Sequence, residues 1–332
     1  MWLNRINRLL ALVRRNERSV VNLYQFLTKY SQLLTGTTMF NFGFWTHETK
    51  SIKQAQHALC TLTGNFAELD NAKKIIDVGS GFSGPAKQWN SEYKSIDNLI
   101  CIDINYQALR MSSVTNSRYA NDKKRVMESS IKTNVTNNKY NSNRGDAAIS
   151  LINATATSLP FADSFADRII ALESAQHFKP FLRFIEESHR VLKKGGVLVI
   201  AIPVVTRTRP IGMSGKNMLF DSLRNLRVLG ILSFTWASEH YELNRIKSII
   251  AMEHFLIKDI LCIGQSVYVP LTDFYVKDRK EFRRMIMGEH SSFLERLAVD
   301  IAERIVHRSA LKMKQLSLSG DIDYVLIKAL NK

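Results

Sequence analysis

Short apolar runs recur between residues 74 and 205 and alternate with stretches of helical periodicity. Runs of this length, bounded by glycine, proline or polar residues, are typical of buried strands. The pattern predicts strands over Lys74–Val78, Leu99–Ile104, Ala147–Ile152, Arg168–Glu173 and Val197–Ile202. Phe181–Leu192 is predicted as a helix, and the Lys193-Lys194-Gly195-Gly196 run that follows it is typical of a helix C-cap.

Two later apolar runs, Phe255–Ile263 and Asp323–Lys328, predict two more strands. Strands that alternate with helices form βαβ units, whose strands are parallel. The predicted fold class is therefore α/β, a Rossmann-like sheet of seven mostly parallel strands with helices on both faces.

Three segments do not follow this alternation of strands and helices. Residues 1–35 carry arginines and a lysine with the single acid Glu17, and predict a basic amphipathic helical extension to a main domain over 36–332. Residues 121–146 hold six Asn and six Lys/Arg and predict a mobile loop. Residues 204–250 predict a helical insertion after the fifth strand, which either caps the sheet edge or closes over a substrate.

The net charge of +16, from 46 Lys and Arg against 30 Asp and Glu, favours anionic partners. Residues 1–35 either pack on the domain or dock on an anionic membrane surface. Cys60, Cys101 and Cys262 form no CxxC pair, so we expect neither a disulfide framework nor a metal site. No apolar run approaches the roughly 18–20 residues that span a bilayer, and no secretory leader is visible. The expected location is cytoplasmic, with peripheral membrane contact left open.

The strongest local signal is a strand that runs into a glycine-rich turn, Asp77-Val78-Gly79-Ser80-Gly81-Phe82-Ser83-Gly84. Asp103 follows 22 residues after Gly81, at the end of the next predicted strand, where an acid can accept both hydroxyls of a ribose. Dinucleotide-binding enzymes have the same glycine spacing, so these residues alone leave NAD open.

Four blocks in order carry a more specific resemblance: Asp77–Gly81, Asp103, Leu159-Pro160-Phe161-Ala162-Asp163 and Val191–Leu198. The chain resembles class I S-adenosylmethionine-dependent methyltransferases, in the small-molecule (type 11) branch with tocopherol, sugar O- and geranyl-diphosphate C-methyltransferases. NAD-dependent oxidoreductases have no place for the last two blocks. The resemblance implies S-adenosylmethionine as the cofactor and a small molecule as the methyl acceptor.

The resemblance also implies roles for individual residues. Asp77 would bind the methionine ammonium, the turn Gly79-Ser80-Gly81 would allow close contact with the cofactor, and Asp103 would bind ribose. Ile104 would pack on adenine, with Thr155 and Ala156 at the adenine edge. Tyr30 and the segment Asn41–Trp45 would close over the cofactor. Two positions depart from the family: Ser83 replaces a common glycine, and Thr155 replaces an aspartate that meets the adenine amino group.

His177 and Glu173 follow the fourth predicted strand and are expected to border the reacting methyl group. A hydroxyl acceptor needs a general base, for which His177 is the candidate. A carbon acceptor would instead need aromatic faces and a carboxylate such as Glu173. Several aromatic residues favour a hydrophobic or ring-bearing acceptor, namely Trp236, Tyr241, Tyr268, Phe274 and Tyr275.

Two other functions compete with this prediction. Nucleic-acid methylation fits the positive charge, but the chain has neither an Asn-Pro-Pro-Tyr motif nor a recognisable RNA-binding module. A non-catalytic S-adenosylmethionine-binding relative is disfavoured by the intact Gly79, Gly81 and Asp103. The sequence predicts neither the acceptor's identity nor the oligomeric state.

Overall fold

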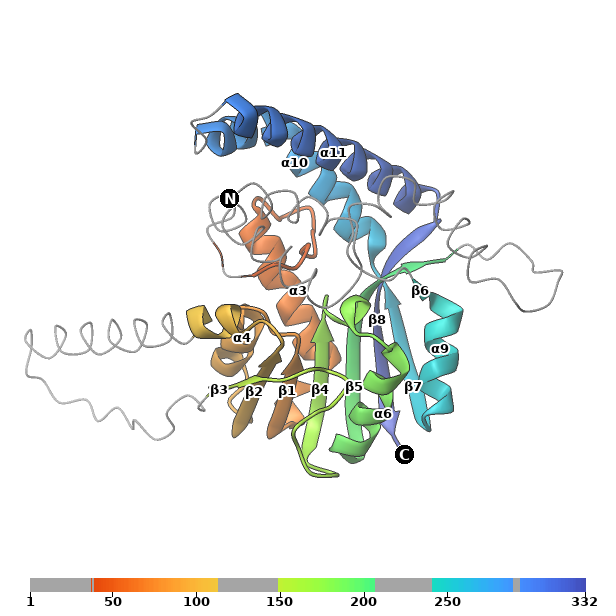
Figure 1. Ribbon diagram of the computed structural model, residues 1–332. Helices are drawn as coiled ribbons and strands as arrows, with labels where there is room; N and C mark the ends of the chain where they lie inside the picture. Colours follow the sequence, from red (N-terminus) through yellow and green to blue (C-terminus); the bar gives the residue numbers. More distant parts are fainter. Residues whose placement is uncertain (1–36, 38, 113–148, 207–240, 289–292) are drawn as a thin grey trace, which may run out of the picture.

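The computed structural model describes residues 37, 39–112, 149–206, 241–288 and 293–332 (Figure 1). The predicted basic extension with Tyr30, the predicted loop over 121–146 and Trp236 therefore lie outside the described residues.

The described chain forms one sheet in the order β3-β2-β1-β4-β5-β8-β7, with the short strand β6 paired to β5. The parallel strands are β1 (Lys74–Val78), β2 (Asn98–Asp103), β3 (Ile149–Asn153), β4 (Ala166–Leu172), β5 (Leu192–Val205) and β6 (Tyr241–Glu242). The antiparallel β8 (Ile322–Asn331) lies between β5 and β7 (Phe255–Cys262). The predicted α/β sheet is confirmed, and the two-residue β6 raises its seven predicted strands to eight.

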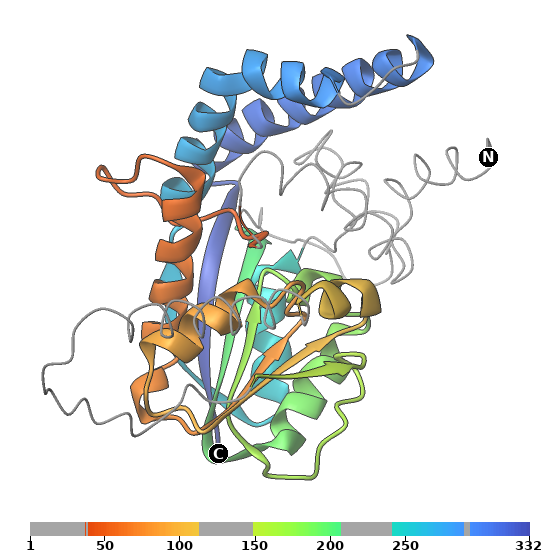
Figure 2. The ribbon, with the colours of Figure 1, turned by 90° about the vertical axis from the view of Figure 1, so that its left-hand side faces the viewer.

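Helices cover both faces of the sheet (Figure 2). Successive residues of a strand point to opposite faces, so Ile75 and Ile76 of β1 belong to two different cores. Ile75 shares its core with Leu59 of α3 (Ile52–Phe66) and Trp89 of α4 (Gly84–Glu92). Ile76 packs in the other core, with side chains of α6 (Phe181–Val191) and α9 (Leu243–Met252). Two short 3₁₀ turns are η1 (Leu69–Asn71) and η2 (Ala175–His177).

The predicted C-cap after the α6 helix is wrong. The helix ends at Val191 and β5 begins at Leu192, so Lys193–Gly196 lie inside a strand. Between the pairs Ala166↔Leu192 and Arg168↔Val197 the register shifts, because the four residues bulge out of β5. Gly195 permits the bulge with its φ of +76°, and Lys193 Nζ contacts the Asp167 carboxylate at 2.6 Å.

The predicted helical insertion over 204–250 is only partly visible. Its first residues continue β5 to Val205, and its last form β6 and the beginning of α9. Residues 207–240 lie outside the described residues, so neither a cap nor a lid is tested there.

The helices α10 (Gly264–Gly288) and α11 (Phe293–Leu318) form an antiparallel pair that extends beyond the sheet (Figures 1 and 2). Glu303 links them, since its carboxylate accepts hydrogen bonds from Arg279 at 2.6 and 2.8 Å and from the Tyr275 hydroxyl at 2.7 Å. Among the described helices, none combines the length and the apolar character needed to cross a bilayer.

Candidate functional site

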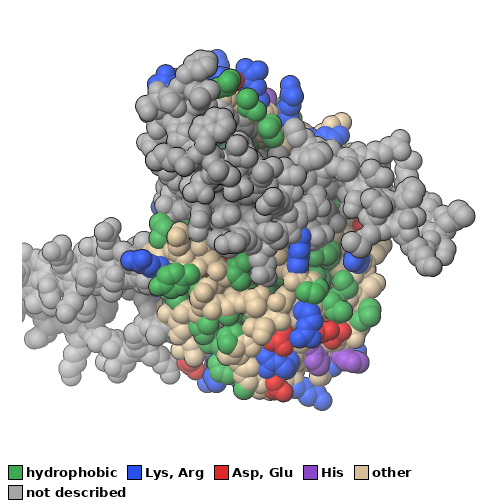
Figure 3. Space-filling view, in the orientation of Figure 1, with side chains coloured by type: hydrophobic (Ala, Val, Ile, Leu, Met, Phe, Trp, Pro, Cys, Tyr) green, Lys and Arg blue, Asp and Glu red, His purple; other side chains and the backbone are tan. Residues whose placement is uncertain are grey.

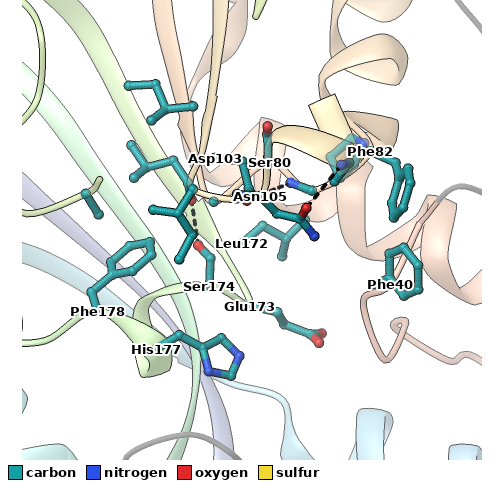
Figure 4. Close-up of a pocket in the computed structure, with 18 of the residues that line it drawn as sticks. Phe40, Ser80, Phe82, Asp103, Asn105, Leu172, Glu173, Ser174, His177 and Phe178 are labelled. Atoms are coloured by element: carbon teal, nitrogen blue, oxygen red, sulfur yellow. Dashed lines mark hydrogen bonds between the residues drawn. The ribbon is translucent and has the colours of Figure 1, made fainter. Parts of the chain in front are cut away.

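A cavity with about 1080 Å³ of empty space, part of it open to solvent, lies at the carboxyl ends of β1, β2 and β4 (Figure 4). In open α/β sheets this edge is where ligands bind. The lining residues come from the strand ends and the loops that follow them: Phe40, Asn41, Val78–Phe82, Pro85, Ile102–Asn105, Ala108, Ala154–Ala156, Leu172–Ser174, His177 and Phe178.

The glycine-rich turn after β1 is tied to β2. The amides of Gly79 and Ser80 both donate to the Ile102 carbonyl, at 2.7 and 3.0 Å. Gly79 has a φ of +75°, and a Cβ atom there would lie 2.4 Å from the Ser174 Cβ. Gly81 has a φ of +54° and nothing within 4 Å of the position of a Cβ. The turn therefore leaves open space for a ligand directly beside Gly81.

Asp103 ends β2 and is held from two sides. Its Oδ2 accepts from the Gly81 amide at 2.8 Å, and its Oδ1 accepts from the Asn105 amide at 2.7 Å. Burial raises the pKa of Asp103, while these two hydrogen bonds to the carboxylate oppose the shift. The carboxylate is thus fixed at the cavity wall before any ligand arrives.

Asp77 is buried in β1 immediately before the turn and is not itself a lining residue. Its Oδ2 has no hydrogen-bond partner among the described residues. Burial, and secondarily the nearby Asp103 carboxylate, raise the pKa of Asp77 to about 8. An orphaned buried carboxylate oxygen next to a ligand cavity fits a cationic group of the ligand, reached directly or through a water molecule.

Ser83, where the family commonly has glycine, does not line the cavity. It has a φ of +55° and begins α4 as its N-cap. The departure therefore changes backbone strain in the turn rather than clearance of the ligand, because left-handed conformations favour glycine.

Glu173 follows β4 with a φ of +53° and reaches the cavity (Figure 4). Its Oε1 accepts from the Phe42 amide at 2.8 Å and from the Tyr324 hydroxyl at 3.0 Å. Burial raises the pKa of Glu173 to about 8, although both hydrogen bonds act in the opposite direction. The strained backbone and the raised pKa are both typical of functional sites.

His177 ends η2 and lines the same end of the cavity as Glu173 (Figure 4). Its amide donates to the Ser174 carbonyl at 2.9 Å. The Ser174 hydroxyl in turn donates to the Val78 carbonyl at 2.6 Å, which joins this turn to β1. The structure thus brings together the two residues predicted as catalytic.

Of the other predicted residues, Gly79, Ser80, Ile104, Thr155 and Ala156 line the cavity. Trp45 does not. Its indole nitrogen donates to the Phe42 carbonyl at 3.2 Å, and its ring packs 5.4 Å from that of Phe274 in α10. The neighbouring Phe40 and Asn41 reach the cavity instead.

The described aromatic residues predicted to contact the acceptor do not line this cavity. Tyr268 and Tyr241 are buried in the two cores, while Phe274 and Tyr275 pack within the α10–α11 region. The cavity has other aromatic walls, which sequence reasoning missed: Phe40 and Phe82, 5.2 Å apart, and Phe178 on the opposite side (Figure 4). Phe82 lies in the glycine-rich turn and Phe178 directly follows His177, and these positions were the available signal. Within the described part of the chain, no cluster of three or more His, Cys, Asp or Glu side chains is arranged to hold a metal ion.

Comparison with known proteins agrees with this geometry. Residues 76–200 match the model of a family described as a methyltransferase domain. The chain is similar to the erythromycin 3''-O-methyltransferase of Saccharopolyspora erythraea, with 21% identity over 254 residues, which are 76% of this chain and 74% of the relative.

Solved structures share the fold. The [4+2]-cyclase SpnF matches with a TM-score of 0.63 and 18% identity, over 96% of this chain and 97% of that one. Geranyl diphosphate C-methyltransferase from Streptomyces coelicolor A3(2) matches with a TM-score of 0.54 and 13% identity, over 91% and 98%.

Proposed function

Since the chain is a class I S-adenosylmethionine-dependent methyltransferase of the small-molecule type, we propose that it methylates a hydroxyl oxygen of a hydrophobic, ring-bearing acceptor. The position of His177 at the cavity end that also holds Glu173 carries this proposal (Figure 4).

The cofactor, when bound, supplies a methyl group activated by a sulfonium centre. We propose that Asp103 accepts the ribose hydroxyls and that Asp77 compensates the ammonium group. The turn Gly79-Ser80-Gly81 gives the backbone clearance for close contact. Ile104, Thr155 and Ala156 would receive the adenine, with the Thr155 hydroxyl as acceptor for its amino group.

His177 would accept the proton of the acceptor hydroxyl and later release it to solvent. The oxygen would form its new bond to the methyl carbon as the methyl–sulfur bond breaks and its electron pair stays on sulfur. A positioned base of this kind contributes about 10²–10⁴-fold to the rate. The protein's other tasks are to align the oxygen and to exclude water. Phe40, Phe82 and Phe178 give the cavity the apolar walls that both tasks need.

The similarity to an erythromycin 3''-O-methyltransferase supports a hydroxyl oxygen as the methyl acceptor. The apolar character of the cavity walls supports the same acceptor class.

A carbon acceptor is the second candidate. Glu173 favours it, because this acid lines a cavity with aromatic walls and, once ionised, stabilises a cation that forms on an alkene. In that case Glu173, and not His177, would be essential.

The test is methyl transfer from isotope-labelled cofactor to a panel of acceptors, with products identified by mass spectrometry. The panel contains lipophilic glycosides with free hydroxyl groups, the same glycosides with those hydroxyls blocked, and prenyl diphosphates. Transfer to free glycosides alone supports the proposal. Transfer to prenyl diphosphates alone supports the carbon acceptor. If the chain binds the cofactor and no member of the panel is methylated, the proposed acceptor class is wrong.

A further inference from the structure

One face of α11 carries a row of exposed side chains that the proposed activity does not use. The row follows the alternating four- and three-residue spacing that keeps positions on one side of a helix. Its apolar members are large and well exposed: Leu297 at 47%, Ile301 at 53%, Leu311 at 45% and Leu318 at 57%. The exposed Arg304, Arg308 and Gln315 fill the positions between them.

The opposite face of α11 is packed toward the C-terminal end of the helix, although Val306 on the same face is 51% exposed. Met313 and Leu316 are buried there, and the Ala310 carbonyl accepts a hydrogen bond from Thr272 of α10. The exposed row is therefore not needed to hold the helix pair together. Figure 3 shows hydrophobic and basic side chains side by side over this projecting pair.

The row contains two arginines and no acid. The acid at its border, Asp300, contacts both Arg283 and Arg304. The neighbouring α10 adds the exposed Lys277, Lys280 and Arg284 against the exposed acids Asp273 and Glu281, of which Asp273 pairs with Lys314. The exposed basic residues named on this surface therefore outnumber its exposed acids, and those of α11 alternate with its exposed apolar side chains.

We propose that this face of α11 binds the surface of an anionic lipid bilayer. A helix that lies in the interface buries apolar side chains at the acyl boundary and leaves basic ones among the phosphate groups. Arginine stems can extend along the apolar layer while the guanidinium stays with the headgroups. The helix pair projects beyond the sheet (Figure 2), and the apolar side chains of the row are exposed, so a flat surface can reach this face.

A second copy of the chain fits this face less well. In a two-fold interface the same patch meets itself, and a two-fold axis near the middle of the row would set Arg304 against Arg308 of the other copy. Like charges at the centre of an apolar contact are unfavourable. The proposal depends only on this helix surface. It would hold even if the acceptor class proposed for the methyl transfer were wrong.

The experiment is co-sedimentation of the full chain with two kinds of vesicle, phosphatidylcholine alone and phosphatidylcholine with added phosphatidylglycerol. The variants are Ile301→Glu and Arg308→Glu, both on the exposed row. Met252→Glu is the matched control, because Met252 is 67% exposed on α9 and lies outside the row. Circular dichroism and titration with S-adenosylhomocysteine verify that each variant folds and retains the cofactor site.

We expect binding to the anionic vesicles that weakens with salt and falls about fivefold or more in each row variant, as expected when a charge near the surface changes. Met252→Glu should bind like the unmodified chain. Equal vesicle binding by all variants would overturn the proposal and assign binding to another segment, such as residues 1–35. Absence of vesicle binding would also overturn it. In that case, light scattering tests whether the exposed row forms a dimer, which Ile301→Glu should dissociate. A chain that is monomeric with and without this substitution would leave an acidic protein as the partner of this face.

Discussion

The Tyr324 hydroxyl of β8 donates a 3.0 Å hydrogen bond to Oε1 of Glu173, the residue that follows β4. The Phe42 amide donates to the same oxygen at 2.8 Å. One carboxylate at the cavity thus joins the segment before α3, the end of β4 and the last strand. Because these donors stabilise the charged form, they oppose the effect of burial on the Glu173 pKa.

Replacement of Tyr324 by Phe should remove one of the two donors without opening a cavity. We expect a loss of about 1 kcal/mol in the free energy of unfolding, the net contribution of one hydrogen bond. Denaturant titration measures it. Tyr268→Phe is the control, since this equally buried hydroxyl donates to the Asp323 carbonyl instead. Only Tyr324→Phe should also raise the pKa of Glu173 further. The free energy of unfolding should therefore depend on pH differently in the two variants, and an equal dependence would contradict this.

The cofactor-free protein should lose stability as the pH rises from about 4 to 8. The pKa of Asp77 and that of Glu173 are both raised to about 8 by burial, so the folded state holds protons that the unfolded state has released. The contribution is fully present below the ordinary carboxyl pKa and is lost as the pH passes the folded value. Each group contributes a slope of up to about 1.4 kcal/mol per pH unit.

Glu173→Gln should remove its share of that slope while the amide oxygen still accepts from Tyr324. Melting temperatures between pH 4 and 8 provide the measurement. Asp259→Asn, an exposed acid of β7, is the control and should leave the slope unchanged. An unaltered slope in Glu173→Gln would show that Glu173 is already charged in the folded state at neutral pH.

Gly81→Ala should weaken cofactor binding by more than its effect on stability explains. Gly81 and Gly320 both have positive φ values, +54° and +68°, and both have free space around a Cβ. Alanine at either position should therefore cost about 1–2 kcal/mol of stability from the backbone alone. Only Gly81 lines the cavity. Titration with S-adenosylhomocysteine should show weaker binding for Gly81→Ala and unchanged binding for Gly320→Ala.

Much of this architecture follows from local pattern. The β1 strand matches its prediction residue for residue, because a short, mostly apolar segment that ends at a glycine-rich turn is typical of a buried strand. Asp103 was placed correctly at the end of β2, since parallel strands end at the same sheet edge. Residues that line the cavity at such strand ends can thus be predicted from the sequence.

The sequence pattern did not predict contacts between segments that are distant in the chain. The bulge in β5 depends on the pairing of Lys193 with Asp167 across two strands. The orientation of Trp45 depends on Phe274 of α10, which is far away in the chain. The exposure of α11 likewise depends on which of its faces α10 covers. Periodicity predicts that a helix has two faces, and only the packed structure shows which one remains exposed.

Asp103→Ala should abolish most cofactor binding. The carboxylate is held by Gly81 and Asn105 and would offer two charge-assisted hydrogen bonds to a ribose. Their loss should cost about 3 kcal/mol, which is roughly a hundredfold in affinity. Calorimetric titration with S-adenosylhomocysteine measures this, with Asp259→Ala as the control. Unchanged affinity in Asp103→Ala would contradict the proposed ribose contact.

His177→Gln should lower kcat by about 10²–10⁴-fold, as expected for loss of a general base, and leave S-adenosylhomocysteine affinity unchanged. Glutamine retains the approximate size of the ring but cannot take up the proton. The pH–rate profile should therefore also lose the acidic limb that reports the base. His189→Gln is the control, because His189 packs against Phe255 away from the cavity and should leave both kcat and the profile unchanged. A normal rate in His177→Gln, together with an inactive Glu173→Gln, would instead indicate methylation at carbon.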